Sequence, residues 1–67
     1  MQRKDYESAI SDYTKALEID SNLPEAYYNR GMAFIHSGKK TEGIADLSKA
    51  GELGLYTAYS VLKKYNK

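Results

Sequence analysis

The segment PEAYYNRGMAFIHSG, residues 24–38, decides the fold of this chain. Its apolar positions Tyr27, Gly31 and Phe34 recur at three- and four-residue intervals, which is the periodicity of one helix face. The opening proline suits a first helical turn, and the closing glycine suits a left-handed helix stop. We therefore predict a helix that begins at the proline and ends at Ser37.

Helical periodicity continues on both sides of this segment. A helix is predicted over residues 5–19, and the polar break after it ends with Asn22, which can cap the following helix. A third helix is predicted over 40–53 and a fourth over 56–65, with Gly54 ending the third. No stretch alternates with a period of two residues, so we predict no strand.

An internal repeat relates these helices to one another. A shift of 34 residues places 5–20 over 39–54, and five of the sixteen aligned pairs are then identical. The identical pairs are Ile10 with Ile44, Asp12 with Asp46, Lys15 with Lys49, Ala16 with Ala50, and Glu18 with Glu52. A shift of 32 residues places 56–59 over 24–27. The chain therefore consists of two alternating types of helix.

Length and composition limit the classes of function. With 67 residues, the chain allows one small domain, residues 1–67. A net charge of +1 gives no electrostatic case for binding nucleic acid or an anionic membrane. The chain has no cysteine, which excludes disulfides and thiolate metal sites. We see no signal peptide or membrane span, so the compartment is unknown and a cytoplasmic location is the default expectation.

The same helices resemble the tetratricopeptide repeat. The matching residues are Ala26, Tyr27, Asn29, Gly31 and Phe34 in one helix and Ile44, Leu47 and Ala50 in the next. The resemblance implies an all-α fold of antiparallel helix-turn-helix repeats, a fragment of a right-handed α-solenoid with about four helices. It assigns 1–20 to the second helix of a partial repeat, 22–54 to one full repeat, and 55–67 to a C-terminal capping helix. The junction before the capping helix resembles that of the related Sel-like repeats.

The resemblance also implies where small residues and ligands lie. Gly31 and Gly43 are expected where neighbouring helices approach closely, although the family often has alanine where Gly43 stands. The first helix of each pair is expected to line a concave groove that binds a peptide. The residues expected in this groove are Glu25, Tyr28, Met32, Ile35, His36, Ser60 and Lys64. The apolar stripe among them would equally serve to pack on a neighbouring repeat or on the fourth helix, so both interpretations stay open.

A different surface is expected on the first helix. Tyr6, Ile10 and Tyr13 form its apolar stripe, and the helix that should precede it in a complete repeat is absent from the sequence. We therefore expect either a homodimer through this helix or a place within a longer array. Either role is structural, and it is the alternative to binding a peptide.

Other classes of function find little support. The single histidine, His36, has no partner at metal-ligand spacing, and no glycine-rich phosphate loop follows a strand. We therefore expect no catalytic residue, no cofactor and no metal, and we predict that the chain is not an enzyme. Four of the seven tyrosines, Tyr6, Tyr13, Tyr27 and Tyr59, fall on predicted core stripes, which argues against stacking on nucleic acid. The expected partner is a protein or peptide, with no nucleic acid and no membrane.

Some family members hold the C-terminal carboxylate of heat-shock chaperones with lysine, arginine and asparagine side chains. The corresponding groove positions here carry Tyr28 and Met32. The sequence therefore argues against that ligand.

Overall fold

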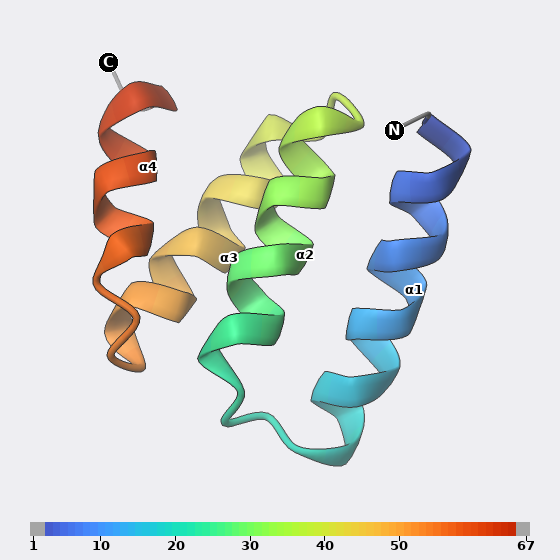
Figure 1. Cartoon of the computed structure of the whole chain (residues 1–67), viewed down its shortest axis with the longest axis horizontal. Helices are drawn as coiled ribbons and strands as arrows, with labels where there is room; N and C mark the ends of the chain where they lie inside the picture. The colour runs from blue at the N-terminus through green and yellow to red at the C-terminus, as the bar shows by residue number, and fades with distance from the viewer. Residues whose placement is uncertain (1–2, 66–67) are drawn as a thin grey trace.

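The computed structural model describes residues 3–65, and these residues form four helices. They are α1 (Arg3–Ile19), α2 (Pro24–His36), α3 (Lys40–Glu52) and α4 (Thr57–Tyr65). Consecutive helices run antiparallel (Figure 1), and each packs on its neighbour in the chain. The all-α fold predicted from the sequence is confirmed, with helix ends within two residues of the predicted ones. Residues 1–2 and 66–67, which belong to the predicted partial repeat and capping segment, lie outside the described residues.

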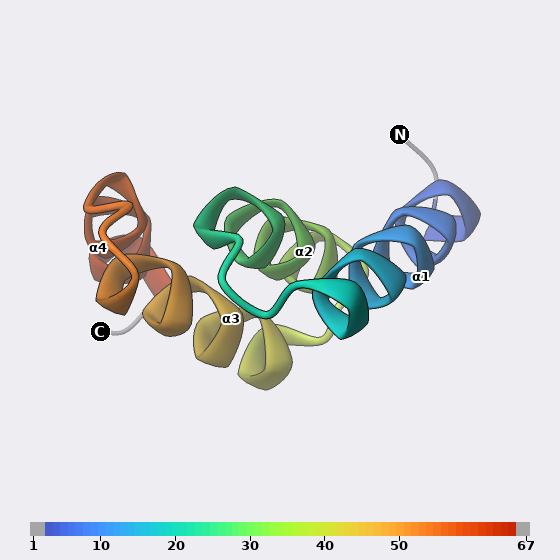
Figure 2. The same cartoon turned by 90° about the horizontal axis from the view of Figure 1, so that it is seen from below.

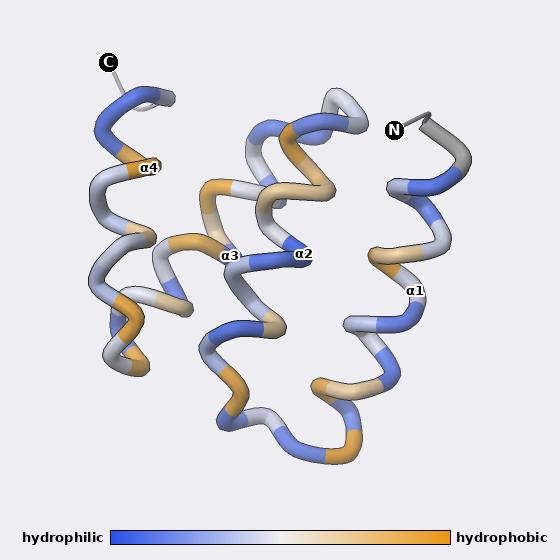
Figure 3. Tube along the Cα trace, viewed as in Figure 1, coloured by the Kyte–Doolittle hydropathy of each residue, from blue (hydrophilic) through white to orange (hydrophobic). Residues whose placement is uncertain are grey.

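The helices are arranged as a zigzag. Seen from the end, α3 lies below α2 and α4 (Figure 2), so α2 and α4 share one side of the molecule. The most extensive contact is between α2 and α3, followed by α1 with α2 and then α3 with α4. Apart from Ile19 at its exposed end, the apolar stretches of α1 lie on the side that faces α2 and are separated by hydrophilic turns (Figure 3).

The loops after α2 and α3 have the same geometry. Gly38 and Gly54 have φ values of 92° and 110°, in the left-handed region that favours glycine. After Gly38, the Lys39 amide donates to the Phe34 carbonyl at 2.7 Å. After Gly54, the amide of the next residue donates to the Ala50 carbonyl at 3.0 Å. Both are Schellman stops, as the two glycines predicted.

The start of α2 differs from the prediction that Asn22 caps it. The residue at the cap is Leu23, and no side chain caps the helix. The Asn22 amide instead donates to a carboxylate oxygen of Asp20 at 2.9 Å, which forms a tight polar turn. The Leu23 carbonyl accepts the amides of Ala26 and Tyr27, at 3.0 and 3.2 Å. The prediction for Asn22 was wrong because this turn places the asparagine one residue too early.

The core lies between α2, α3 and α4. Leu47, Ala50 and Ala58 are fully buried, and half-buried aromatic and aliphatic residues pack around them. The backbones of α2 and α3 touch at Gly31 and Gly43, where a methyl group added to Gly31 would lie 2.9 Å from the Gly43 carbonyl oxygen. The prediction that these glycines mark a close approach is confirmed.

One predicted core residue lies largely outside the core. Tyr59 was placed on the buried stripe of the fourth helix, but its side chain is 42% exposed. One part of its ring rests on Gly51 of α3, and a second tyrosine, Tyr56, stacks beside it with ring centroids 6.4 Å apart. Among the described residues, no further helix follows α4 to cover the outer side of this ring.

Candidate peptide-binding groove

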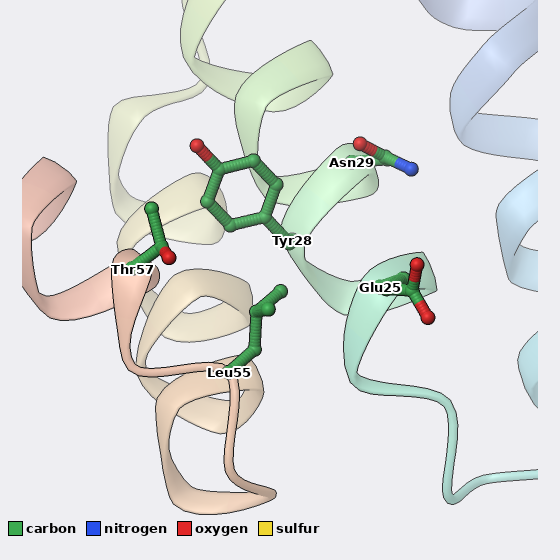
Figure 4. Close-up of a pocket in the computed structure, with 5 residues that line it drawn as sticks. All are labelled: Glu25, Tyr28, Asn29, Leu55 and Thr57. Atoms are coloured by element: carbon green, nitrogen blue, oxygen red, sulfur yellow. The ribbon is translucent and has the colours of Figure 1, made fainter.

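A groove of about 280 Å³ lies between α2 and the start of α4. Its lining residues are Glu25, Tyr28, Asn29, Leu55 and Thr57. The Tyr28 ring projects from α2 towards Leu55 and Thr57, while Glu25 and Asn29 lie along α2 itself (Figure 4). The tyrosine ring and the leucine supply an apolar floor, and the remaining groups supply hydrogen-bonding partners. Such a combination suits a short peptide segment with one apolar anchor.

Local structure positions this groove. Pro24 at the first turn fixes the start of α2, so Glu25 and Tyr28 follow at set angles around the helix. The Schellman stop at Gly54 turns the chain so that Leu55 comes back towards α2. Tyr28 and Leu55 both pack against the buried cluster, so the apolar floor of the groove is continuous with the core.

The charge of the lining is acidic. Among the described residues that line this groove, Glu25 is the only charged one. The nearest arginine in the sequence, Arg30, is engaged elsewhere. Its guanidinium donates to both carboxylate oxygens of Asp46 in α3, at 2.7 and 2.8 Å, and to the Thr14 hydroxyl of α1 at 3.2 Å. The Asp46 hydrogen bond is the main cause that raises the pKa of Arg30, so this cation stays charged and fixed between helices.

A second groove of about 160 Å³ lies between α1 and α2. Its lining residues are Tyr6, Ala9, Tyr13, Asn29, Met32, Ala33 and His36. The Tyr6 and His36 rings stack across it with centroids 5.4 Å apart and planes 22° from parallel. This contact joins the first turns of α1 to the end of α2.

The structure distributes the predicted groove residues over several places. Glu25 and Tyr28 line the α2–α4 groove, while Met32 and His36 line the α1–α2 groove. Ile35 lies over Gly43 of α3, where an added methyl group would come within 2.5 Å of its Cγ1 atom. Two further residues, Ser60 and Lys64, are exposed on α4 and line neither groove.

Sequence reasoning missed three residues of the α2–α4 groove. Leu55 lies in the turn before α4, and Thr57 is the first residue of that helix. Asn29 was noted only as part of the repeat pattern. The residues expected to self-associate, Tyr6, Ile10 and Tyr13, are all half-buried. The two tyrosines line the α1–α2 groove, and the Ile10 carbonyl accepts a hydrogen bond from the Thr14 hydroxyl at 2.7 Å.

Within residues 3–65, no group of three or more histidine, cysteine, aspartate or glutamate side chains is placed to hold a metal ion. In the same part of the chain, no helix is long and apolar enough to cross a membrane.

Comparison with known proteins identifies the family. A family model described as TPR repeat matches residues 1–38, and one described as tetratricopeptide repeat matches residues 24–53. No solved structure matches the chain significantly.

Several curated relatives match most of this chain. The Hsp70-Hsp90 organizing protein of Triticum aestivum is 45% identical over 53 residues, which are 79% of this chain and 9% of that protein. Small glutamine-rich tetratricopeptide repeat-containing protein 2 of Mycosarcoma maydis is 38% identical over 79% of this chain and 15% of its own length. Photosystem I assembly protein Ycf3 of Acaryochloris marina (strain MBIC 11017) is 37% identical over 69% of this chain and 28% of its own length.

The chain therefore spans a small part of each of these relatives. Two of them are named for organizing or assembling other proteins. Together with the family models, these names indicate that repeats of this kind take part in protein–protein interactions. The fold, the internal repeat and both family models agree, and the chain belongs to the tetratricopeptide repeat family.

Proposed function

We propose that the chain binds a peptide segment of a partner protein in the α2–α4 groove. The observation that carries this proposal is the lining itself, in which an apolar floor of Tyr28 and Leu55 is bordered by Glu25, Asn29 and Thr57. Tyrosine is a frequent anchor at protein interfaces because its ring contributes area at a low cost in side-chain entropy. Neither residue of the apolar floor is fully buried, so a ligand side chain can gain contact with both.

The charges of the groove define the peptide. Because Glu25 is exposed and no described cation lines the groove, a segment with basic or N–H donor groups around an apolar side chain is favoured. An acidic segment that ends in a free carboxylate would meet Glu25 without a compensating cation. The relatives named for organizing Hsp70 and Hsp90 suggest chaperones as partners, but the lining favours a ligand other than an acidic chaperone tail.

Two peptide probes of about nine residues test this proposal. One carries lysines around a central phenylalanine and has both ends blocked; the other is acidic and has a free C-terminal carboxylate. Binding is measured from chemical shifts of the ¹⁵N-labelled chain. We expect the basic peptide to bind and to shift the amides of Glu25, Tyr28, Asn29 and Leu55.

A matched pair of charge reversals tests the role of Glu25. Glu25 and Glu42 are both exposed acids in the first turn of a helix, but only Glu25 lines the groove. We expect Glu25→Lys to weaken the basic peptide about five-fold and Glu42→Lys to leave its affinity unchanged. Tighter binding of the acidic peptide would overturn the proposal. If neither peptide changes the chemical shifts of the groove amides, the alternative function is favoured, which is a structural role within a repeat array.

A further inference from the structure

The polar groups that border the α2–α4 groove are all hydrogen-bond acceptors. Glu25 and Asn29 are both exposed and are four residues apart on α2, which is the spacing of neighbours on a helix surface. Thr57 is exposed on the other side of the Tyr28 side chain (Figure 4). Among the side chains of residues 5–65, no hydrogen bond or ion pair engages any of these three. Their carboxylate, amide and hydroxyl oxygens can therefore all accept from one donor-rich ligand.

Elsewhere in the same chain, groups of these kinds hold a guanidinium. Arg30 donates to the two carboxylate oxygens of Asp46 at 2.7 and 2.8 Å and to the Thr14 hydroxyl at 3.2 Å. Its guanidinium carbon also lies 5.7 Å from the centroid of the Tyr27 ring and 5.8 Å from that of the Phe34 ring. A carboxylate, a hydroxyl and an aromatic ring are therefore the set of groups that satisfies an arginine in this protein.

The α2–α4 groove presents the same three kinds of group, and none of its described lining residues is basic. Glu25 supplies the carboxylate, Thr57 the hydroxyl and Tyr28 the aromatic ring. Leu55 adds an apolar surface for the methylene stem of a long side chain. The groove volume of about 280 Å³ is just below the range of about 300 to 1,000 Å³ that is typical of ligand pockets. This size suits one side chain rather than a whole folded segment.

We infer that the residue of the partner peptide that enters this groove is an arginine. The inference rests on the proposed function, because it names the side chain that the groove selects from the bound peptide. The methylene stem of the arginine supplies the apolar anchor and lies on Leu55. The guanidinium lies between the Tyr28 ring and the Glu25 carboxylate, and Asn29 and Thr57 accept its remaining N–H groups.

Other side chains match this set of groups less well. The lysine ammonium is compact and strongly hydrated, whereas the guanidinium is planar, more weakly hydrated and carries five N–H donors. Arginine can therefore stack on Tyr28 and meet Glu25 edge-on at the same time. An apolar side chain would cover Leu55 and Tyr28 but would give Glu25 no partner.

Three blocked peptides test the inference, each made of glycine and serine around one central residue. That residue is arginine, lysine or citrulline, which is the neutral isostere of arginine. Dissociation constants come from titrations of the ¹⁵N-labelled chain. We expect a constant on the order of 1 mM for the arginine peptide. The lysine peptide should bind about three-fold more weakly, and the citrulline peptide about five-fold more weakly.

A double-mutant cycle tests the contact with Glu25. Glu25→Gln should weaken the arginine peptide about three-fold and leave the citrulline peptide unchanged, because only the charged ligand gains from the carboxylate. Glu42→Gln is the matched control, since Glu42 is an exposed acid in the first turn of α3 and does not line the groove. It should leave the affinity of both peptides unchanged.

The contact with Tyr28 is tested without a substitution, because this residue also packs against the buried cluster. We expect nuclear Overhauser effects between the δ-methylene protons of the peptide arginine and the Tyr28 ring.

The outcomes separate this inference from the proposed function. Equal affinities of the three peptides, together with binding of the phenylalanine peptide described above, would overturn the inference and leave the proposed function intact. An unchanged affinity of the arginine peptide for the Glu25→Gln chain would also overturn the inference, because the guanidinium would then lie elsewhere. If none of these peptides binds up to about 5 mM, both the inference and the proposed function are wrong.

Discussion

The Arg30 guanidinium in α2 holds both carboxylate oxygens of Asp46 in α3, with Nε to Oδ2 at 2.7 Å and Nη2 to Oδ1 at 2.8 Å. The side chains are only 18% and 10% exposed, and the guanidinium also lies near the rings of Tyr27 and Phe34. A two-point ion pair of this kind fixes the rotation of one helix on the other as well as their distance.

Loss of this pair should destabilise the chain. We expect Asp46→Asn to lower the free energy of unfolding by about 2 kcal/mol, since a largely buried arginine loses its counter-charge. Urea unfolding followed by circular dichroism measures the change. Asp12→Asn is the matched control, because Asp12 is the repeat equivalent and is exposed, and it should alter stability by less than about 0.5 kcal/mol. Equal effects of the two substitutions would contradict the importance of the pair.

Substitution by alanine should affect the stability of the chain differently at the two glycines of α3, Gly43 and Gly51. At Gly43 an added methyl group meets backbone, the Gly31 carbonyl oxygen at 2.7 Å, so the helices must separate. We expect Gly43→Ala to cost about 1 to 3 kcal/mol even though alanine is common there in the family. At Gly51 the three atoms nearest to an added methyl group all belong to the ring of Tyr59, which is 42% exposed and can move aside.

For Gly51→Ala we therefore expect no loss of stability, or a gain of up to about 1 kcal/mol from helix propensity. Thermal unfolding of both variants provides the comparison. A lower melting temperature for Gly51→Ala than for Gly43→Ala would show that the ring of Tyr59 is held more firmly than the helix contact.

The turn after α2 should be sensitive to a side chain at Gly38. No atom outside its neighbours in the chain lies within 4 Å of a methyl group added there, so sterics do not oppose it. The φ of 92° opposes a side chain, because residues other than glycine rarely adopt it. We expect Gly38→Ala to lower the free energy of unfolding by about 1 kcal/mol or more. Gly38→Asn should cost less, because asparagine tolerates the left-handed region better. Equal stability of the alanine and asparagine variants would contradict this explanation.

The start of α1 should depend on the stack between Tyr6 and His36. An aromatic pair of this geometry contributes about 0.5 to 1.5 kcal/mol. We expect Tyr6→Ala to speed hydrogen exchange of the amides in the first half of α1 and to leave α3 protected. Tyr56→Ala removes an exposed tyrosine elsewhere and should leave exchange in α1 unchanged. Uniformly faster exchange in all helices would mean that α1 is not a separate opening unit.

The sequence predicted helices and turns well because the signals for them are local. Spacing of apolar residues identified each helix, and Gly38 and Gly54 identified two stops that need a positive φ. The close approach of Gly31 to Gly43 followed from the family pattern. The prediction of a cap at Asn22 was wrong because the Asp20 carboxylate accepts the Asn22 amide and forms a turn there. Local rules do not decide between two polar residues that lie so close together.

Prediction of the grooves was limited by what periodicity measures. A helical period tells which residues share a face, but the rotation of α2 on α3 decides which neighbour each residue meets. Ile35 and Met32 lie on one predicted stripe, yet one lies over Gly43 and the other lines the α1–α2 groove. The pairing of Arg30 with Asp46 had only an indirect signal, the identity of Asp12 and Asp46 in the repeat.

The Thr14 hydroxyl accepts a hydrogen bond from the same guanidinium that holds Asp46, so one side chain connects α1, α2 and α3. Thr14 belongs to the partial repeat, whereas Arg30 and Asp46 belong to the complete repeat. A chain that was divided between the two repeats would therefore lose the hydrogen bond to Thr14. The connection through Arg30 therefore crosses the boundary between the sequence repeats.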